Sequence, residues 1–278
     1  MIITHFQARK LIQALNSGLS SIRISLDLGK TQDKVVIKTD RFIFSNKEIL
    51  TIEQIKKVKK KQKSCFIIRD NVIKKVHFFN EQTNKYYKLF PTTSWPTIEI
   101  SGIRMHVTKE ISPKKDTEKK IKFIEPCIGT VLDTCTGLGY TSILASKSAD
   151  KVYTYEVDEA VIELEKINPW SQELFVNSKI KRHKGNIFEQ IQELQNNFFD
   201  RIIHDPPRFS LSPDLYSQEF YNQLFRVIKQ EGKIYHYTGN PGKKYRNVKF
   251  KKGVIKRMGI AGFSDLKEVF NGVTGERK

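Results

Sequence analysis

Thr130-Val-Leu-Asp-Thr-Cys-Thr-Gly-Leu-Gly-Tyr140 is the stretch of the sequence that decides the fold. Residues 130–134 have the apolar, β-branched character of a buried strand, and a helical pattern follows at 142–149. Between them stand Gly137 and Gly139, where glycine permits positive backbone torsions and lets a ligand approach the main chain closely. In a parallel sheet this turn lies at the strand carboxyl ends, where nucleotide-like ligands bind. An ordinary strand-to-helix turn could use the same two glycines.

The alternation of strand and helix continues along the rest of the chain. Strand-length apolar runs are separated by stretches in which apolar residues recur at helical spacing. The predicted strands are 151–156, 180–183, 199–204 and 233–237, and the predicted helices are 159–167 and 218–227. Because strands that alternate with helices form parallel sheets covered on both faces, these patterns predict an α/β fold.

The first ninety residues follow a different pattern, that of a small α+β domain. Alternating runs predict strands at 22–26, 34–38, 64–68 and 75–79, and helical spacing predicts helices at 6–15 and 51–60, the second capped by Thr51. The segments 91–96, with two prolines, and 111–120, polar and charged, interrupt these patterns. We therefore expect two domains, a small α+β accessory domain at 1–92, possibly RNA-binding, and an α/β domain at 93–278.

The chain is strongly basic, with 49 Lys plus Arg against 30 Asp plus Glu and a formal net charge of +19. This balance favours polyanionic partners and counts against cationic substrates, although a lysine-rich composition without functional meaning would give the same number. The three cysteines lack a Cys-x-x-Cys spacing, so we expect neither a disulfide framework nor a metal site. No run of about 18 apolar residues and no signal-peptide core is present, which predicts a cytoplasmic protein with no membrane partner.

Three further positions fit a nucleoside bound at the glycine turn. Glu156 ends the next predicted strand, about twenty residues after the turn, where a carboxylate can accept hydrogen bonds from both ribose hydroxyls. Cys135 stands where a pyrophosphate-binding turn has its first glycine, which favours a ligand without phosphate, such as a methionine-bearing nucleoside. Asn186 is placed to contact an adenine amino group, but a simple turn explains it at least as well.

Four motifs in order resemble those of class I S-adenosylmethionine-dependent methyltransferases, namely 133–139, Glu156, Asn186 and Asp205-Pro-Pro207. More narrowly, 132–141, 168–171, 204–210 and 236–239 are similar to a group of predicted archaeal methyltransferases with an Asp-Pro-Pro-Arg-Phe motif. The resemblance covers the chain from about Trp95 to its end. It implies a Rossmann-like, mostly parallel seven-stranded sheet and S-adenosyl-L-methionine as cofactor. The cofactor-binding residues that we predict are Asp133, Cys135, Gly137, Gly139, Glu156 and Asn186.

The motif Asp205-Pro-Pro207 is expected at the same sheet edge as the glycine turn. A carboxylate and a carbonyl that accept the two protons of a base amine would direct its lone pair toward a methyl sulfonium. We predict Asp205 and the Pro206 carbonyl in these roles, with Pro207 fixing the backbone. The family pattern usually has an aromatic residue next, whereas this chain has Arg208. Either Phe209 stacks on the base, or Arg208 stacks or grips a phosphate.

Two other features lie near this centre in the predicted fold. His204 precedes the motif and is expected to be a packed strand residue rather than a base. A basic, glycine-containing loop is predicted at 238–252, at the same sheet edge, and from it we assign Lys243, Lys244 and Arg246 to RNA binding. The same stretch would also suit a solvated basic loop without a partner.

The leading hypothesis is an S-adenosylmethionine-dependent N-methyltransferase that acts on an exocyclic amine of an RNA base. Ribosomal RNA is favoured over transfer RNA, and cytosine N4 or guanine N2 over adenine N6; the resemblance favours cytosine N4. A second hypothesis is aminopropyl transfer from the decarboxylated cofactor to a polyamine, which uses the same fold, although the charge of +19 counts against a polycationic acceptor. A third is a non-catalytic RNA-binding module, and a fourth is methylation of protein side-chain amides.

Overall fold

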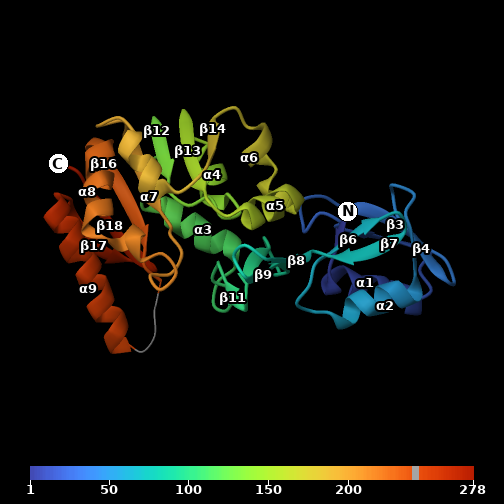
Figure 1. Cartoon of the computed structure of the whole chain (residues 1–278). Helices are drawn as coiled ribbons and strands as arrows, with labels where there is room; N and C mark the ends of the chain where they lie inside the picture. Colours follow the sequence, from blue (N-terminus) through green and yellow to red (C-terminus); the bar gives the residue numbers. More distant parts are fainter. Residues whose placement is uncertain (240–243) are drawn as a thin grey trace. The chain divides into compact units, whose positions relative to one another are not determined.

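The structure is a computed structural model that describes residues 1–239 and 244–278, without the side chains of 244–248. The chain forms two compact units (Figure 1). Unit 1 comprises Met1–Lys114 and Glu163–Trp170, and unit 2 comprises Lys115–Ile162 and Ser171–Lys278. The division into domains at residue 92 stays a prediction.

Unit 2 contains a seven-stranded sheet in the order β14-β13-β12-β15-β16-β18-β17. Its strands are β12 (Thr130–Asp133), β13 (Lys151–Glu156), β14 (Ile180–Lys184), β15 (Phe199–His204), β16 (Ile228–Tyr237), β17 (Ser264–Val269) and β18 (Gly272–Glu276). The first five strands in this order are parallel, and β18 is antiparallel to both of its neighbours. The predicted α/β fold with a mostly parallel, Rossmann-like sheet of seven strands is confirmed.

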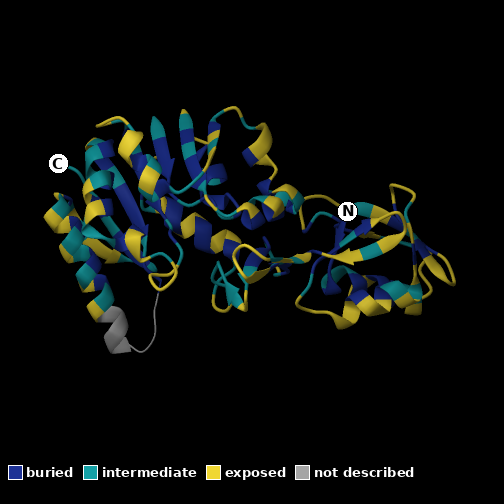
Figure 2. Ribbon diagram, in the orientation of Figure 1, coloured by how far each residue is buried: buried dark blue, intermediate teal, exposed yellow. Residues whose placement is uncertain are grey.

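The helices of unit 2 cover both faces of this sheet. They are α3 (Pro113–Lys122), α4 (Tyr140–Ala145), α5 (Glu159–Ile167), α6 (Glu173–Val176), α7 (Ile187–Gln190), α8 (Gln218–Val227) and α9 (Lys244–Ala261). Of these, α3 begins in unit 1 and α5 ends in unit 1. The 3₁₀ turns are η1 (Pro169–Ser171), η2 (Ile191–Glu193) and η3 (Pro213–Tyr216). On one face Leu132 and Ile202 join a core with Leu224 of α8. On the other, Val131 and Ile203 pack with residues of α3 and α4. Figure 2 shows the central strands as largely buried, which explains their continuous apolar runs.

The basic loop predicted at 238–252 is wrong from residue 244 onward, because α9 begins there. Val254 and Met258 are fully buried on this helix, one turn apart, and the helix packs against α8. The apolar spacing that forms this helix starts at Phe250, within the basic stretch, and the many lysines around it hid the helical period in the sequence.

Unit 1 is built from three small antiparallel sheets and two helices. The sheets are β1 (Ile2–Ile3), β6 (Phe66–Arg69) and β7 (Val72–Lys75); β2 (Ser21–Ile24), β3 (Asp33–Ile37), β4 (Arg41–Ile43) and β5 (Ile49–Thr51); and β8 (His77–Asn80), β9 (Lys85–Phe90), β10 (Thr97–Ile100) and β11 (Ile103–Arg104). The helices are α1 (His5–Asn16) and α2 (Ile52–Lys60). Thr51 caps α2 as predicted, since its hydroxyl accepts from the Gln54 N–H at 3.2 Å.

The single strand predicted at 75–79 is instead divided between two sheets at Val76. The Val76 N–H donates to the Cys65 carbonyl at 2.9 Å, while the Val76 carbonyl accepts from the Leu89 N–H at 3.1 Å. The chain therefore passes from one sheet to the next at this buried residue, without a turn that would mark the change in the sequence. None of the helices among the described residues has the length and apolarity that crossing a membrane requires.

Candidate active site

The turn between β12 and α4 has a backbone that glycine adopts far more readily than other residues. The φ angle is 55° at Gly137 and 74° at Gly139, both in the left-handed region. A Cβ atom on Gly139 would lie 2.3 Å from Leu174 Cδ1, so a side chain does not fit there. A Cβ atom on Gly137 would meet nothing within 4 Å. The turn thus presents bare backbone and open space at the carboxyl end of β12.

Glu156, the last residue of β13, contacts this turn directly. Its Oε2 accepts a hydrogen bond from the Gly137 N–H at 2.9 Å, and its Oε1 accepts from the Asp158 N–H at 3.0 Å. Burial raises the pKa of Glu156 to about 7, although the two N–H groups act in the opposite direction. Because a carboxylate has about four acceptor sites, both oxygens can still accept from ligand hydroxyls.

Asp133, the last residue of β12, is fully buried beside the same turn. Its Oδ2 accepts from the hydroxyls of Thr141 at 2.7 Å and Ser142 at 2.6 Å, which fixes the start of α4 to the strand. Its Oδ1 is buried and has no hydrogen-bond partner within the described part of the chain. Burial raises the pKa of Asp133 to about 7. One oxygen of this carboxyl therefore has a structural role, and the other keeps its acceptor capacity.

The two other residues predicted to bind the cofactor make local contacts. The Asn186 Oδ1 accepts from the Phe188 N–H at 3.1 Å, so Asn186 caps α7, and its Nδ2 donates to Glu189 at 3.0 Å. This is the simple turn that the sequence left open. Cys135 is half-buried, and its sulfur lies 3.8 Å from the Thr134 hydroxyl oxygen. Burial raises the pKa of the Cys135 thiol, which favours its protonated form.

Asp205 follows β15 and belongs to a buried cluster of charges. Lys120 Nζ donates to Asp205 Oδ2 at 2.7 Å and lies 3.1 Å from Asp116 Oδ2. The side chains of Lys120 and Asp116 are 3% and 0% exposed, whereas that of Asp205 is 19% exposed. Burial lowers the pKa of Lys120, but Asp205 and Asp116 outweigh burial and hold it well above its ordinary value. Lys120 is therefore a buried ammonium between two carboxyl groups, and of these Asp205 reaches solvent.

Phe209, four residues after Asp205, lines an open cavity of about 410 Å³. The Tyr216 hydroxyl donates to the Pro207 carbonyl at 2.9 Å. Phe209 is 48% exposed, and its ring centre lies 5.6 Å from that of Tyr216 and 5.7 Å from that of Phe250. These three rings line the cavity. Arg208 is exposed. The Pro206 carbonyl, predicted as a second acceptor, has no hydrogen-bond donor among the described residues.

His204 is a packed residue, as expected from the sequence. Its Nδ1 lies 2.8 Å from the Thr134 hydroxyl and its Nε2 lies 2.9 Å from the Leu215 carbonyl. Since a carbonyl only accepts, the proton is on Nε2, and Nδ1 accepts from Thr134. Burial lowers the pKa of His204 to about 3, so the ring is neutral. His204 thus ties β15 to the end of β12 and to η3.

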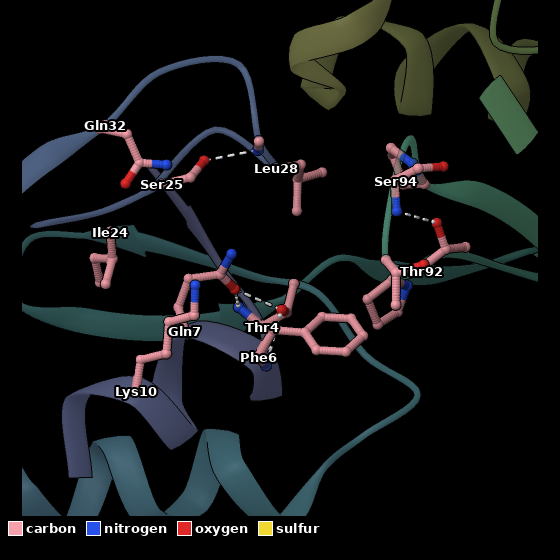
Figure 3. Close-up of a pocket in the computed structure, with 14 residues that line it drawn as sticks. Thr4, Phe6, Gln7, Lys10, Ile24, Ser25, Leu28, Gln32, Thr92 and Ser94 are labelled. Carbon is pink, nitrogen blue, oxygen red and sulfur yellow. Dashed lines mark hydrogen bonds between the residues drawn. The ribbon is translucent and has the colours of Figure 1, made fainter. Parts of the chain in front are cut away.

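The predicted RNA-binding residues are not part of the described site. Lys243 lies outside the described residues, and the side chains of Lys244 and Arg246 also lie outside them. Another cavity, of about 320 Å³, lies within unit 1 between the start of α1 and the segments 24–32 and 91–96 (Figure 3). There the Ser25 hydroxyl accepts from the Gly29 N–H at 2.6 Å. None of the predicted site residues lines this cavity.

Lys120, Asp116 and Tyr216 belong to the site, but the sequence interpretation did not select them. Asp116 and Lys120 lie in the segment that was interpreted as a boundary between domains. An acid and a base four residues apart, followed by buried Ile121 and Ile124, would have indicated a packed helix with an internal ion pair.

Comparisons with known proteins give a family and a fold. Residues 130–259 match the spermine/spermidine synthase domain. The Methanocaldococcus jannaschii protein MJ1233, which is described as uncharacterized, is 44% identical over 265 residues, or 92% of this chain and 89% of that protein. The spermidine synthase of Thermotoga maritima is 19% identical and has a TM-score of 0.57 over 75% of this chain and 76% of that one. A spermidine synthase in complex with the transition state analogue AdoDATO gives a TM-score of 0.59 at 19% identity, over 75% and 77%.

The expectation of RNA base N-methylation is therefore wrong, because the matching domain is that of spermine and spermidine synthases. The physical reason is that the first three motifs concern the adenosyl part of the donor, which methyl and aminopropyl donors share. The fourth motif, Asp205-Pro-Pro207, offers acceptors for an amine N–H and does not distinguish a base amine from a polyamine. The net charge of +19 also describes the whole chain, whereas Asp116, Asp133, Glu156 and Asp205 gather near the glycine turn.

What is shown is an α/β Rossmann-like fold shared with spermidine synthases, and the candidate site lies at the carboxyl ends of β12, β13 and β15. Because the identity of 44% extends over most of both chains, this chain belongs to the family of the M. jannaschii protein MJ1233.

Proposed function

We propose that the protein transfers an alkyl group, in the first place an aminopropyl group, from an adenosyl sulfonium nucleoside to an amine nitrogen. The observation that carries this proposal is the placement of Glu156 and Asp205 on the two sides of the glycine turn. β13 and β15 are the neighbours of β12 in the parallel sheet, so their carboxyl ends flank that turn. A donor bound by Glu156 and an acceptor bound by Asp205 would meet there.

The residues on the donor side fit an adenosyl group. Glu156 would accept the ribose hydroxyls, and the buried Oδ1 of Asp133 offers a further acceptor. The open space beside Gly137 would admit the ligand to the backbone. A cationic sulfonium also suits a site with several carboxyl groups. When bound, the donor supplies an alkyl carbon attached to a positively charged sulfur, which is open to attack by nitrogen.

On the acceptor side, Asp205 would orient the amine. Its carboxylate accepts an N–H hydrogen bond and directs the nitrogen lone pair toward the reacting carbon. As the C–N bond forms, the electron pair of the C–S bond passes to sulfur, and the surplus proton of the nitrogen passes to Asp205 or to water. Positioning and proton acceptance are the contributions that this chain makes to the step.

The charge near the turn supports an amine as the acceptor. Four carboxyl groups, those of Asp116, Asp133, Glu156 and Asp205, lie near one ammonium, that of Lys120. A small diamine or triamine fits this local balance better than it fits the positive charge of the whole chain. The likeness to spermidine synthases supports aminopropyl as the transferred group.

The test is to incubate the full chain with decarboxylated S-adenosylmethionine and a panel of diamines and triamines, and to analyse the products by mass spectrometry. We expect one aminopropylated amine and an equal amount of methylthioadenosine. The Asp205→Ala variant, purified in the same way, controls for contaminating synthase activity. Turnover of S-adenosylmethionine in place of the decarboxylated donor, or no turnover with any amine, would contradict the proposal.

A further inference from the structure

We infer that Lys120 is a positioning residue, which holds one oxygen of Asp205 and leaves the other for the acceptor amine. The inference rests on the proposed function and adds a residue of α3 to the site. It concerns the geometry of the acceptor side and not the binding of the donor.

The hydrogen bond from Lys120 occupies one oxygen of Asp205 and leaves the other available. Lys120 Nζ bonds Oδ2 at 2.7 Å, and no hydrogen bond to Oδ1 is formed within the described part of the chain. The next two residues are Pro206 and Pro207, which have no N–H with which to fold back on the carboxylate. With Oδ2 held, the side-chain rotation of Asp205 is fixed, and Oδ1 is the oxygen that an acceptor N–H can reach.

Lys120 is itself held in place on several sides. Asp116, one helical turn earlier in α3, lies 3.1 Å from Nζ, and the Tyr237 ring centre lies 4.3 Å from Nζ. A buried ion pair is often no more stabilising than apolar residues of the same size. Stability alone is therefore a weak reason for a buried ammonium at this place, and its contact with the partly exposed Asp205 carboxylate of the site indicates a functional reason.

Several other titratable groups lie around Asp205, and they make the positive charge of Lys120 important at this place. The groups that face Asp205 come from several elements. They are Asp116 of α3, Asp133 and Cys135 at the end of β12, Tyr216 of η3, Tyr235 and Tyr237 of β16, and Arg208 of the loop that also carries Asp205. Two of these groups are carboxyl groups, and Arg208 is exposed. Removing the Lys120 ammonium would leave the Asp205 and Asp116 carboxyl groups without the buried cation that lies between them.

The first test compares Lys120→Met and Lys120→Arg with Lys122→Met, which removes an exposed lysine of the same helix. For Lys120→Met we expect kcat to fall roughly 10- to 100-fold near neutral pH, because the Asp205 carboxylate is no longer held in one orientation. The donor Kd should change less than about twofold. Lys120→Arg should recover most of the rate, and Lys122→Met should match the wild type. A loss of donor affinity as large as the loss of kcat, without recovery by arginine, would reduce Lys120 to a structural residue.

The second test needs no activity and so separates this inference from the proposed function. The NMR chemical shift of the Asp205 carboxyl carbon is compared at neutral pH in the wild type, Lys120→Met and Lys120→Arg, and Asp205→Asn assigns the signal. We expect the chemical shift to change in Lys120→Met, because the hydrogen bond to Oδ2 is lost, and to return toward the wild-type value in Lys120→Arg; an unchanged chemical shift in Lys120→Met would overturn the inference. If no amine is a substrate, the proposed function fails while this comparison still decides the role of Lys120. Lys120→Gln replaces Lys120→Met if circular dichroism shows that the latter does not fold.

Discussion

Glu156 and Asp205 flank the same turn but are held in place by different means. Glu156 accepts from two backbone N–H groups, whereas Asp205 accepts from a buried ammonium. Backbone donors keep their positions for as long as the sheet and turn are intact. A lysine of α3 and the hydroxyl of Tyr216 hold the other side instead. The donor side thus depends on the main chain and the acceptor side on side chains, so mutations should separate donor affinity from transfer rate.

The largest effect is expected for Asp205→Ala. Because the carboxylate is assigned to the acceptor amine, the transfer rate should fall by roughly 10²- to 10⁴-fold, while donor affinity by calorimetry should stay near that of the wild type. Asp214→Ala, which removes an exposed carboxylate lining the nearby cavity, is the matched control. Full activity of Asp205→Ala would remove the acceptor assignment.

The donor side should respond in the opposite way to Glu156→Ala. Losing hydrogen bonds to a charged group costs about 1.5–3 kcal/mol, so the donor should bind roughly 10- to 150-fold more weakly. The rate at saturating donor should remain close to that of the wild type. Titration calorimetry measures the affinity, with Glu159→Ala, an exposed residue of the adjacent helix, as the control. Equal affinity in Glu156→Ala would argue against the ribose contact.

A smaller effect is expected for Tyr216→Phe. This change removes the hydrogen bond to the Pro207 carbonyl and keeps the ring that packs with Phe209 and Phe250. A net loss of about 0.5–1.5 kcal/mol would correspond to a fall in kcat of roughly 2- to 12-fold, with donor affinity unchanged. Steady-state kinetics at saturating donor measure the fall. A matching loss of donor affinity would mean that Tyr216 supports the whole fold of the site rather than its acceptor side.

Local signals were enough to predict much of unit 2. The predicted 151–156, 159–167, 199–204 and 218–227 coincide with β13, α5, β15 and α8. Buried strands with apolar residues on both faces and helices with one apolar stripe are properties of short segments. By contrast, β16 begins at Ile228, five residues before the predicted start at 233. Glu231 has a φ angle of 60°, and the pairing register between β15 and β16 shifts there. This irregular part of the strand has the composition of a turn, so the sequence pattern did not predict it as strand.

The site was predictable only where its residues follow strands. Parallel topology places the residues after β12, β13 and β15 at one edge, which is why Glu156 and Asp205 were selected together. Lys120 comes from a helix before the sheet, and Tyr216 comes from a 3₁₀ turn between β15 and β16. Asp116, four residues before Lys120, indicates an ion pair on a packed helix, but no sequence feature shows that this lysine reaches Asp205. Likewise, the motifs predicted to bind the donor do not indicate which acceptor the protein uses.

The smallest effect, and the one that tests the donor side most directly, is a change of donor affinity with pH. The pKa of Glu156 is raised to about 7, so at pH 6 most of the free protein carries the protonated carboxyl. Ribose hydroxyls donate more strongly to the ionised form, and a donor that prefers this form binds more tightly as pH rises through 7. Calorimetry between pH 6 and pH 8 should show affinity increasing by roughly five- to tenfold, since a carboxyl group with a pKa of about 7 goes from about one-tenth to about nine-tenths ionised over this range.

Asp133 has its pKa raised to about 7 as well, so two variants are needed to assign the increase. Glu156→Gln keeps an acceptor oxygen but does not titrate, and its donor affinity should be nearly constant over the range. Asp133→Asn can still accept from the hydroxyls of Thr141 and Ser142, and it should retain the increase if Glu156 is responsible. The reverse pattern, constant in Asp133→Asn and rising in Glu156→Gln, would transfer the pH-dependent contact to Asp133. The donor would then be recognised through the free oxygen at the end of β12, and the contrast between a backbone-held Glu156 and a lysine-held Asp205 would no longer describe its binding.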